Sequence, residues 1–253
     1  GRVLYITGDV TPTVEGLRLT GGDATGLGGG QPWGDAGGGV CVYTATATIS
    51  GCVVVSNTAS TADDGLGGGL YLQNSDATLR GNAILSNTAS VSGGSFDGGY
   101  GGGLYLRNSD ATLEGNTATV AGSGLYCDGS GSAALDRTLI TGGVGGEAIF
   151  CDDTYAAILT ACDLFGNEGG DWTAPIAGQL GMDGNISADP QFCEVDPLGH
   201  VSWVLQSDSP CAPTQAGELI GAWPVGCDDT PARRASWGGI KALFGAAARE
   251  EKR

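Results

Sequence analysis

Short apolar alternations recur along the chain, separated by Gly, Asn, Ser and Asp. Residues 67–90 read GGGLYLQNSDATLRGNAILSNTAS, residues 101–124 read GGGLYLRNSDATLEGNTATVAGSG, and a looser copy stands at residues 37–60. Alternation with a period of two predicts short strands, and no segment of the first 230 residues has a convincing helical period. Repetition of one unit at a small period indicates a stacked solenoid.

One apolar position opens the core strand of each repeat. These positions are Leu4, Val40, Leu70, Leu104, Leu125 and Ile149. Their spacing runs from 21 to 36 residues, and the shortest intervals are close to the ~20–29 residues of a solenoid coil. The longer intervals carry inserts at 26–35, 62–66 and 91–99, each just before the glycines that precede the next strand. Inserts confined to one corner of a repeat map to loops on one face of a solenoid.

The pattern therefore predicts an all-β parallel β-helix of about six or seven coils over residues 1–230. Leu70, Leu72 and Leu79 point inward, while Tyr71 and Arg80 point outward. Asn and Gly stand at the corners because they tolerate the left-handed backbone angles that tight turns require.

The C-terminal part differs in composition. Residues 171–230 are richer in Pro and Trp, and we expect an irregular cap there, because the open end of a β-helix would pair with other chains. Residues 231–253 hold six basic and two acidic residues. In this tail Trp237, Ile240, Phe244 and Ala247 follow a helical spacing, which predicts a short amphipathic helix.

Charge excludes some partners. The formal net charge is −17, with 28 acidic and 11 basic residues, and such a field disfavours binding to nucleic acid. No apolar run approaches the ~18 residues that a membrane-spanning helix needs, so we expect no membrane span. The single histidine, His200, argues against a histidine-based zinc site.

The cysteines point to an oxidising compartment. Eight are present, without a C-x-x-C pair, in an acidic chain, which favours an exported protein. Cys127 and Cys151 align in the inward column of successive coils, ~4.8 Å apart, within disulfide range; alternatively, they are two small buried thiols. Cys211 and Cys227 form the second candidate disulfide. Because residues 3–6 already alternate, we interpret the chain as a processed or excised piece.

The repeats resemble a known family. The run G-G-G-[LV]-Y-[LV]…ATL-x-G-N…SNTA, followed by GNISADPQFC, SPCAPT and LIGAWPVGC in residues 184–227, is similar to the right-handed parallel β-helix repeats of large exported bacterial proteins, the pectate-lyase-like solenoids. The resemblance implies a right-handed, extracellular or cell-surface protein. The related fold houses pectate lyases, with calcium-binding aspartates and an arginine, and polygalacturonases, with aspartates and a histidine. Here His200 lies outside the repeats and the arginines are scattered.

Three sets of outward residues could carry chemistry. An aromatic column could stack on sugar rings, or its rings could stack on one another beneath the inserts; it consists of Tyr71, Tyr105, Tyr126 and Phe150. A second column places Arg80 beside Glu114, and Glu114 with Asp136 is the best candidate for a catalytic carboxylate pair. A third column holds Gln73, Arg107, Asp128 and Asp152. Aspartates at the inserts could bind calcium or form a solvated acidic rim; these are Asp23, Asp35, Asp63, Asp64 and Asp97.

Together these patterns predict a non-catalytic extracellular structural or adhesive β-helix, without a cofactor unless calcium is one. The first coil, near residues 3–6, has no coil before it to pair with, which predicts end-to-end self-association into filaments. The other expected partner is a glycan or cell-surface ligand. The alternative is a carbohydrate-binding or polysaccharide-cleaving module.

Overall fold

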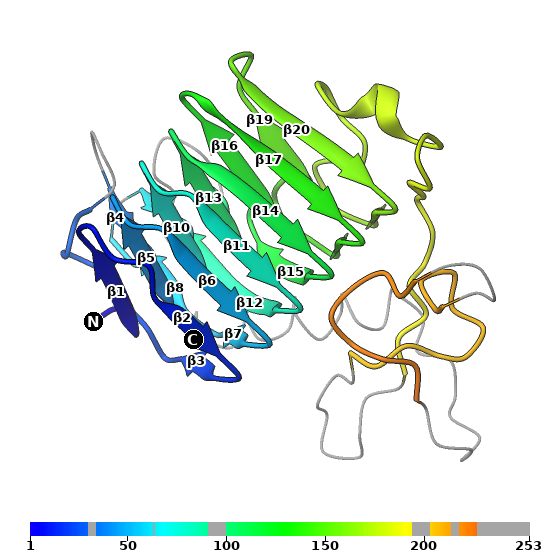
Figure 1. Cartoon of the computed structure of the whole chain (residues 1–253), viewed down its shortest axis with the longest axis horizontal. Coiled ribbons are helices and arrows are strands. Elements are labelled where there is room, and N and C mark those ends of the chain that lie inside the picture. The colour runs from blue at the N-terminus through cyan, green and yellow to red at the C-terminus, as the bar shows by residue number, and fades with distance from the viewer. Residues whose placement is uncertain (30–33, 63, 91–99, 194–202, 214–217, 227–253) are drawn as a thin grey trace, which may run out of the picture.

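The chain forms a β-solenoid in which three parallel sheets run side by side along one axis (Figure 1). This is a computed structural model, and it describes residues 1–29, 34–62, 64–90, 100–193, 203–213 and 218–226. Six coils stack in the described part. Each contributes one strand to each long sheet, and one coil adds a second, short strand to the third sheet. The predicted helix in residues 231–253 lies outside the described residues.

Each long sheet takes the strand at the same position of every coil. Sheet A consists of β1 (Leu4–Thr7), β5 (Val40–Tyr43), β10 (Leu70–Gln73), β13 (Leu104–Arg107), β16 (Leu125–Asp128) and β19 (Ile149–Cys151). Sheet B consists of β2 (Thr13–Glu15), β6 (Ala47–Ser50), β11 (Ala77–Arg80), β14 (Asp110–Glu114), β17 (Gly131–Asp136) and β20 (Tyr155–Thr160). Sheet C consists of β3 (Arg18–Thr20), β7 (Val53–Val55), β12 (Ala83–Ser90), β15 (Thr117–Ala121), β18 (Leu139–Thr141) and β21 (Asp163–Phe165), with β8 (Thr58–Ser60) paired to β12.

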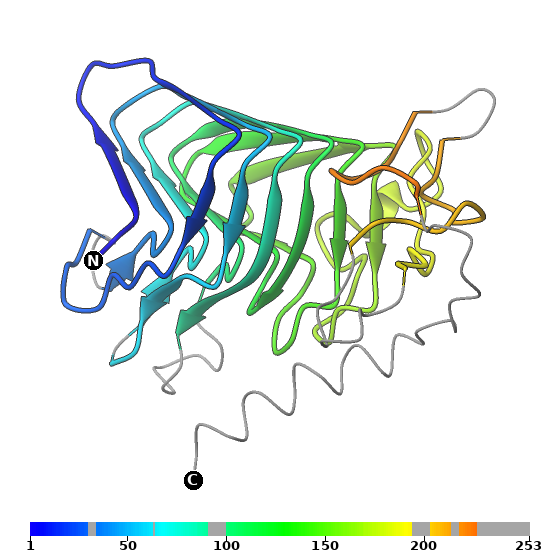
Figure 2. The same cartoon turned by 90° about the horizontal axis from the view of Figure 1, so that it is seen from below.

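The register follows the predicted columns. Leu70 pairs with Val40 on one side and Leu104 on the other, and the same column continues to Leu125 and Ile149. Its side chains fill a continuous apolar core inside the coils. Figure 2 shows the coils stacked one behind the other along the axis of the solenoid. The prediction of an all-β parallel β-helix with these columns is confirmed.

The inserts also stack. β4 (Asp35–Ala36) pairs with β9 (Gly65–Leu66), and Leu66 forms a bridge with Tyr100 in the next coil. The described parts of the first two inserts therefore lie at one corner, and they cover the outer face of sheet A. The third insert, residues 91–99, lies outside the described residues.

Ladders of amide side chains hold the corners together. Asn82 accepts a hydrogen bond from the backbone N–H of Cys52 (2.9 Å) and donates to the carbonyl of Ile49 (2.8 Å) and to Oδ1 of Asn116 (3.1 Å). Asn57 and Asn87 form a second ladder of the same kind. Because these turns are buried, their backbone groups have no water to bond, and the asparagines satisfy them.

We expect Asn82→Ala to lower the free energy of unfolding by about 3 kcal/mol, because it leaves a buried N–H and a buried carbonyl without partners. Urea denaturation measures the effect. The control is Asn74→Gly, at an exposed corner with φ +50° that glycine adopts without strain. Equal denaturation midpoints for the two variants would contradict a structural role for the ladder.

The predicted cap, residues 171–230, divides into two parts. Ile176 fills the end of the core beside Trp172, and Gln179 of η1 (Ala177–Gln179) pairs with the backbone of Ala157 and Leu159 at the last strand of sheet B. The described residues of 186–226, which we call the clasp, instead lie against the outer face of sheet C. There the backbone of Gly221 bonds to Arg137 (2.7 Å) and that of Ala222 to Thr117 (2.9 Å).

Candidate site on the outer face of sheet A

The aromatic column on the outer face of sheet A builds a second, smaller core. Tyr71 is 0% exposed and Tyr105 is 3% exposed, and both pack with Ala36, Cys41 and Leu66. The inserts that carry β4 and β9 supply this cover. A sugar cannot reach the rings of Tyr71 and Tyr105. At these two positions the ligand-binding interpretation is wrong, and the alternative, rings packed on one another beneath the inserts, is confirmed.

The C-terminal part of the column is half-buried, and its rings are used on one another. Tyr126 stacks on Phe150 with ring centroids 4.6 Å apart and on Tyr105 at 5.1 Å. Tyr100 meets Tyr126 edge-on at 4.8 Å. Stacked rings gain about 0.5–1.5 kcal/mol per pair beyond the area that they bury. The column thus stabilises the stack of coils, and the partly exposed rings at this end are those of Tyr100, Tyr126 and Phe150.

A polar column lies beside the rings. The Tyr71 hydroxyl donates to Oε1 of Gln73 (2.8 Å), and Arg107 forms an ion pair with Oδ2 of Asp128 (2.7 Å) in the next coil. Burial raises the pKa of Asp128, although Tyr105 and Arg107 oppose the shift. The other carboxylate oxygen of Asp128, Oδ1, is buried and has no hydrogen-bond partner. Asp128 therefore has one buried carboxylate oxygen that accepts no hydrogen bond.

Asp152 continues this column at the next coil. Burial raises the pKa of its carboxyl, but hydrogen bonds from Thr154, Gly129 and Tyr155 outweigh burial and hold that pKa below its usual value. Asp128 and Asp152 thus differ in environment, as an acid and a base would in a carboxylate pair.

The candidate carboxylates of sheet B are tied to arginines. Glu114 pairs with Arg80 (3.1 Å) and with Arg137 (2.7 Å), and Arg137 also pairs with Asp136 (3.0 Å) and with Glu218 of the clasp. The predicted pairing of Arg80 with Glu114 is confirmed. Arg137 stands between Glu114 and Asp136, so these carboxylates form an ion network that joins the coils to the clasp.

The insert aspartates do not converge. Asp23 is exposed and accepts hydrogen bonds from the backbone N–H and the hydroxyl of Thr25, which hold its pKa below the usual value. Asp64 is half-buried, and Asp63 and Asp97 lie outside the described residues. Over the described part of the chain, no group of three or more His, Cys, Asp or Glu side chains is placed to hold a metal ion. The calcium site stays a prediction.

Asp35 has a role that the sequence did not reveal. Its buried carboxylate accepts from the backbone N–H groups of Gly26 and Gly28 and from the hydroxyl of Ser60. It thereby organises the first insert from within. An aspartate at the end of a Gly-rich loop is the signal that could have suggested this role.

The cysteines correct the predicted disulfides. Cys127 and Cys151 are neighbours in register, as predicted, but both are free buried thiols, so the second alternative holds. Cys211 is also a free thiol, which makes a Cys211–Cys227 disulfide wrong. Cys193 is the disulfide-bonded cysteine of the described part, and Cys227 lies outside it. Burial raises the pKa of Cys162 to about 12 and that of Cys41 to about 11, which makes both thiols unreactive.

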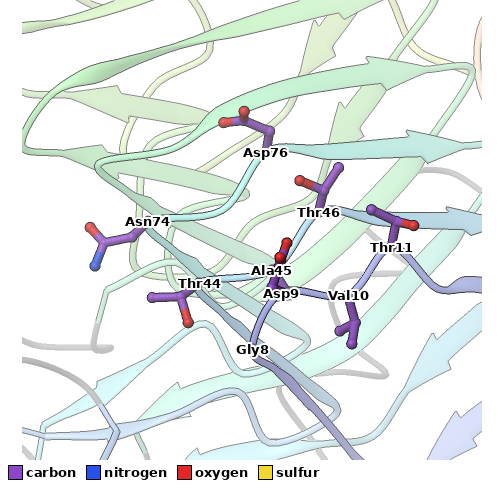
Figure 3. Close-up of a pocket in the computed structure, with 9 residues that line it drawn as sticks. All are labelled: Gly8, Asp9, Val10, Thr11, Thr44, Ala45, Thr46, Asn74 and Asp76. Carbon is purple, nitrogen blue, oxygen red and sulfur yellow. The ribbon is translucent and has the colours of Figure 1, made fainter.

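A small pocket opens at the corner between sheets A and B, in the first three coils (Figure 3). Its volume is about 140 Å³, and Asp9, Thr46, Asn74 and Asp76 are among the residues that line it. Pockets for small molecules usually measure about 300–1,000 Å³. This pocket therefore has room for one small polar group and not for a bound oligosaccharide.

The family follows from the repeats. A family model described as a right-handed β-helix region matches residues 4–185, the span that carries the strands of the described residues. The chain belongs to the right-handed β-helix family. Neither the curated proteins nor the solved structures gave a match to this chain. Right-handed β-helices include both enzymes and non-enzymes, so membership establishes the fold of this β-helix and not its activity.

Proposed function

We propose that this β-helix is a non-catalytic extracellular protein with a structural or adhesive role. The observation that supports the proposal most is the use of outward side chains to join one coil to the next. The ring of Tyr71 packs against that of Tyr105, Arg107 pairs with Asp128, and Arg137 joins two coils to the clasp. A scaffold needs such cross-coil contacts, because each coil contacts only its neighbours and stability is a sum of interface terms.

Cleavage assays test the non-catalytic part of this proposal. The purified chain is incubated with acidic and neutral polysaccharides, with and without calcium, and new reducing ends and unsaturated uronates are measured. We expect no turnover above buffer. Turnover that is lost in Asp128→Asn and kept in Asp110→Asn, an exposed aspartate of sheet B, would overturn the proposal and place catalysis on sheet A.

A second candidate function is binding of a carbohydrate at the reachable end of the aromatic column. The partial exposure of Tyr126 and Phe150 favours it, because a sugar could reach the exposed parts of these two rings. Glycan binding should then weaken at least tenfold in Tyr126→Ala. Tyr5→Ala is the matched control, since Tyr5 belongs to the same column at the other end and is 54% exposed. Equal losses in both variants would exclude this site.

End-to-end self-association remains a proposal. β1, β2 and β3 are the end strands of the three sheets, and Tyr5, Val10 and Leu17 are exposed beside them. Open strand edges pair readily with other strands. Electron micrographs at high protein concentration test the proposal, and uniformly single short rods would refute it.

Over the described residues, no helix is long and apolar enough to cross a bilayer.

A further inference from the structure

A buried carboxylate lies at the seam between the coils and the clasp. Asp163 opens β21 on the outer side of sheet C, in register with Leu139, and it is 0% exposed. Leu139 packs there against Phe192, Leu205 and Ile220 of the clasp. Asp163 is therefore sealed from water by the clasp itself.

The clasp supplies both hydrogen bonds to this carboxylate. The backbone N–H of Ala188 donates to Oδ1 (3.0 Å), and the thiol of Cys211 donates to Oδ2 (3.0 Å). Cys211 is itself fully buried, and its backbone N–H bonds to the Ser209 hydroxyl. A thiol is a weak donor, so it stabilises a carboxylate less than a charged partner would.

The charges around Asp163 make its ionised form costly. The titratable groups that act on it include Cys211 and Asp189 from the clasp and Asp171 from the turn after β21. The buried thiol of the adjacent Cys162 also lies within range of its charge. The ion pairs of the described chain all lie elsewhere. Burial, aided by Asp171 and Asp189, raises the pKa of Asp163 to about 6, although the bonds from Cys211 and Ala188 oppose the shift.

We propose that Asp163 and Cys211 form a proton-operated latch, which holds the clasp on sheet C in mild acid and weakens that hold towards neutral pH. With the clasp open, Asp163 is hydrated and titrates near the ordinary value of about 3.9. The closed state then binds the proton more tightly than the open state. The free energy by which protonation of Asp163 favours the closed clasp is fully present below about pH 4. It is lost as the pH rises to about 6 and does not change further above that.

The experiment follows Cys211 in the full chain. Protein is treated with 4,4′-dithiodipyridine between about pH 4 and pH 7, and the modification of each cysteine is measured by peptide mass spectrometry. The rate in unfolded protein at the same pH gives a protection factor that is free of the intrinsic pH dependence of thiols. A pKa difference of about two units predicts that protection of Cys211 falls about a hundredfold across this range.

Two comparisons isolate the latch. In Asp163→Asn, protection of Cys211 should not vary with pH, because the amide keeps an acceptor for Ala188 and carries no charge. Asp171→Asn should keep most of the dependence, and Cys162, buried among the coils, should stay protected throughout. A Cys211 protection factor that is constant in the wild type, or a dependence that persists in Asp163→Asn, would overturn the proposal. If Asp163→Asn does not fold, carboxyl NMR of the wild type replaces it, and titration of Asp163 below about pH 4.5 would have the same meaning.

Discussion

Replacing Gly68 by alanine is expected to destabilise the β-helix by about 3 kcal/mol or more, at the upper end of overpacking effects. Gly68 is the middle residue of a Gly-Gly-Gly run, where the chain passes from an insert into the core strand of sheet A. A Cβ there would lie well inside van der Waals contact with the backbone of Thr88. Gly38 stands in the same relation to Thr58 one coil earlier. Because these are backbone atoms of a packed coil, they cannot move aside without disturbing the coil, and the steric strain remains in the folded state.

The matched control is Gly178→Ala. A Cβ at Gly178 meets no atom within 4 Å, and its φ does not fall in the left-handed region, so we expect a change within about 0.5 kcal/mol. Urea denaturation, followed by circular dichroism, compares both variants with the wild type. Equal midpoints for Gly68→Ala and Gly178→Ala would show that the repeated glycines are not required for close packing.

Tyr71→Ala is expected to lower the free energy of unfolding by about 3–5 kcal/mol, the range for deletion of a large buried aromatic side chain. The substitution opens a cavity between the coils and the inserts, removes the stacking on Tyr105, and leaves Gln73 without its hydroxyl partner. Such a loss would establish that the column is a core and not a binding surface. The midpoint of urea denaturation measures it.

Two variants separate the contributions to this loss. Tyr71→Phe keeps the ring and removes the hydroxyl, so we expect it to cost only about 1 kcal/mol, the net value of one hydrogen bond. Tyr5→Ala removes a ring of the same column where it is 54% exposed, and a change within about 0.5 kcal/mol is expected. If Tyr71→Ala were as mild as Tyr5→Ala, the second core would not contribute to stability.

The two cores explain why the outer face of sheet A resembles a binding site in the sequence. An aromatic residue that alternates outward from a strand has the same pattern whether it contacts solvent, a ligand or a second layer of protein. Here the decision rests on β4 and β9, whose two-residue strands pair over Tyr71. Pairing of such short strands leaves no periodic signal, so the sequence left a ligand-binding ladder and rings covered by the inserts as alternatives and could not decide between them.

The cysteines and Asp163 also show which contacts the repeat pattern can predict and which it cannot. The register of Cys127 and Cys151 was predictable because they occupy one column of the repeat. The contact between Asp163 and Cys211 joins residues 48 positions apart, and that between Thr117 and Ala222 joins residues 105 apart. Neither contact belongs to the repeat, and the clasp that makes both has no period to read.

The sequence by itself determined the solenoid, its sheets and the register of its columns, because period-two alternation that recurs in every repeat leaves one way to bury the apolar positions. It also placed Arg80 beside Glu114. The tertiary structure alone decided which outward residues are covered, which cysteine is bonded and where residues after 185 lie. These depend on contacts between irregular segments, whose free energies come from shape and burial at one place in space and have no counterpart in local sequence.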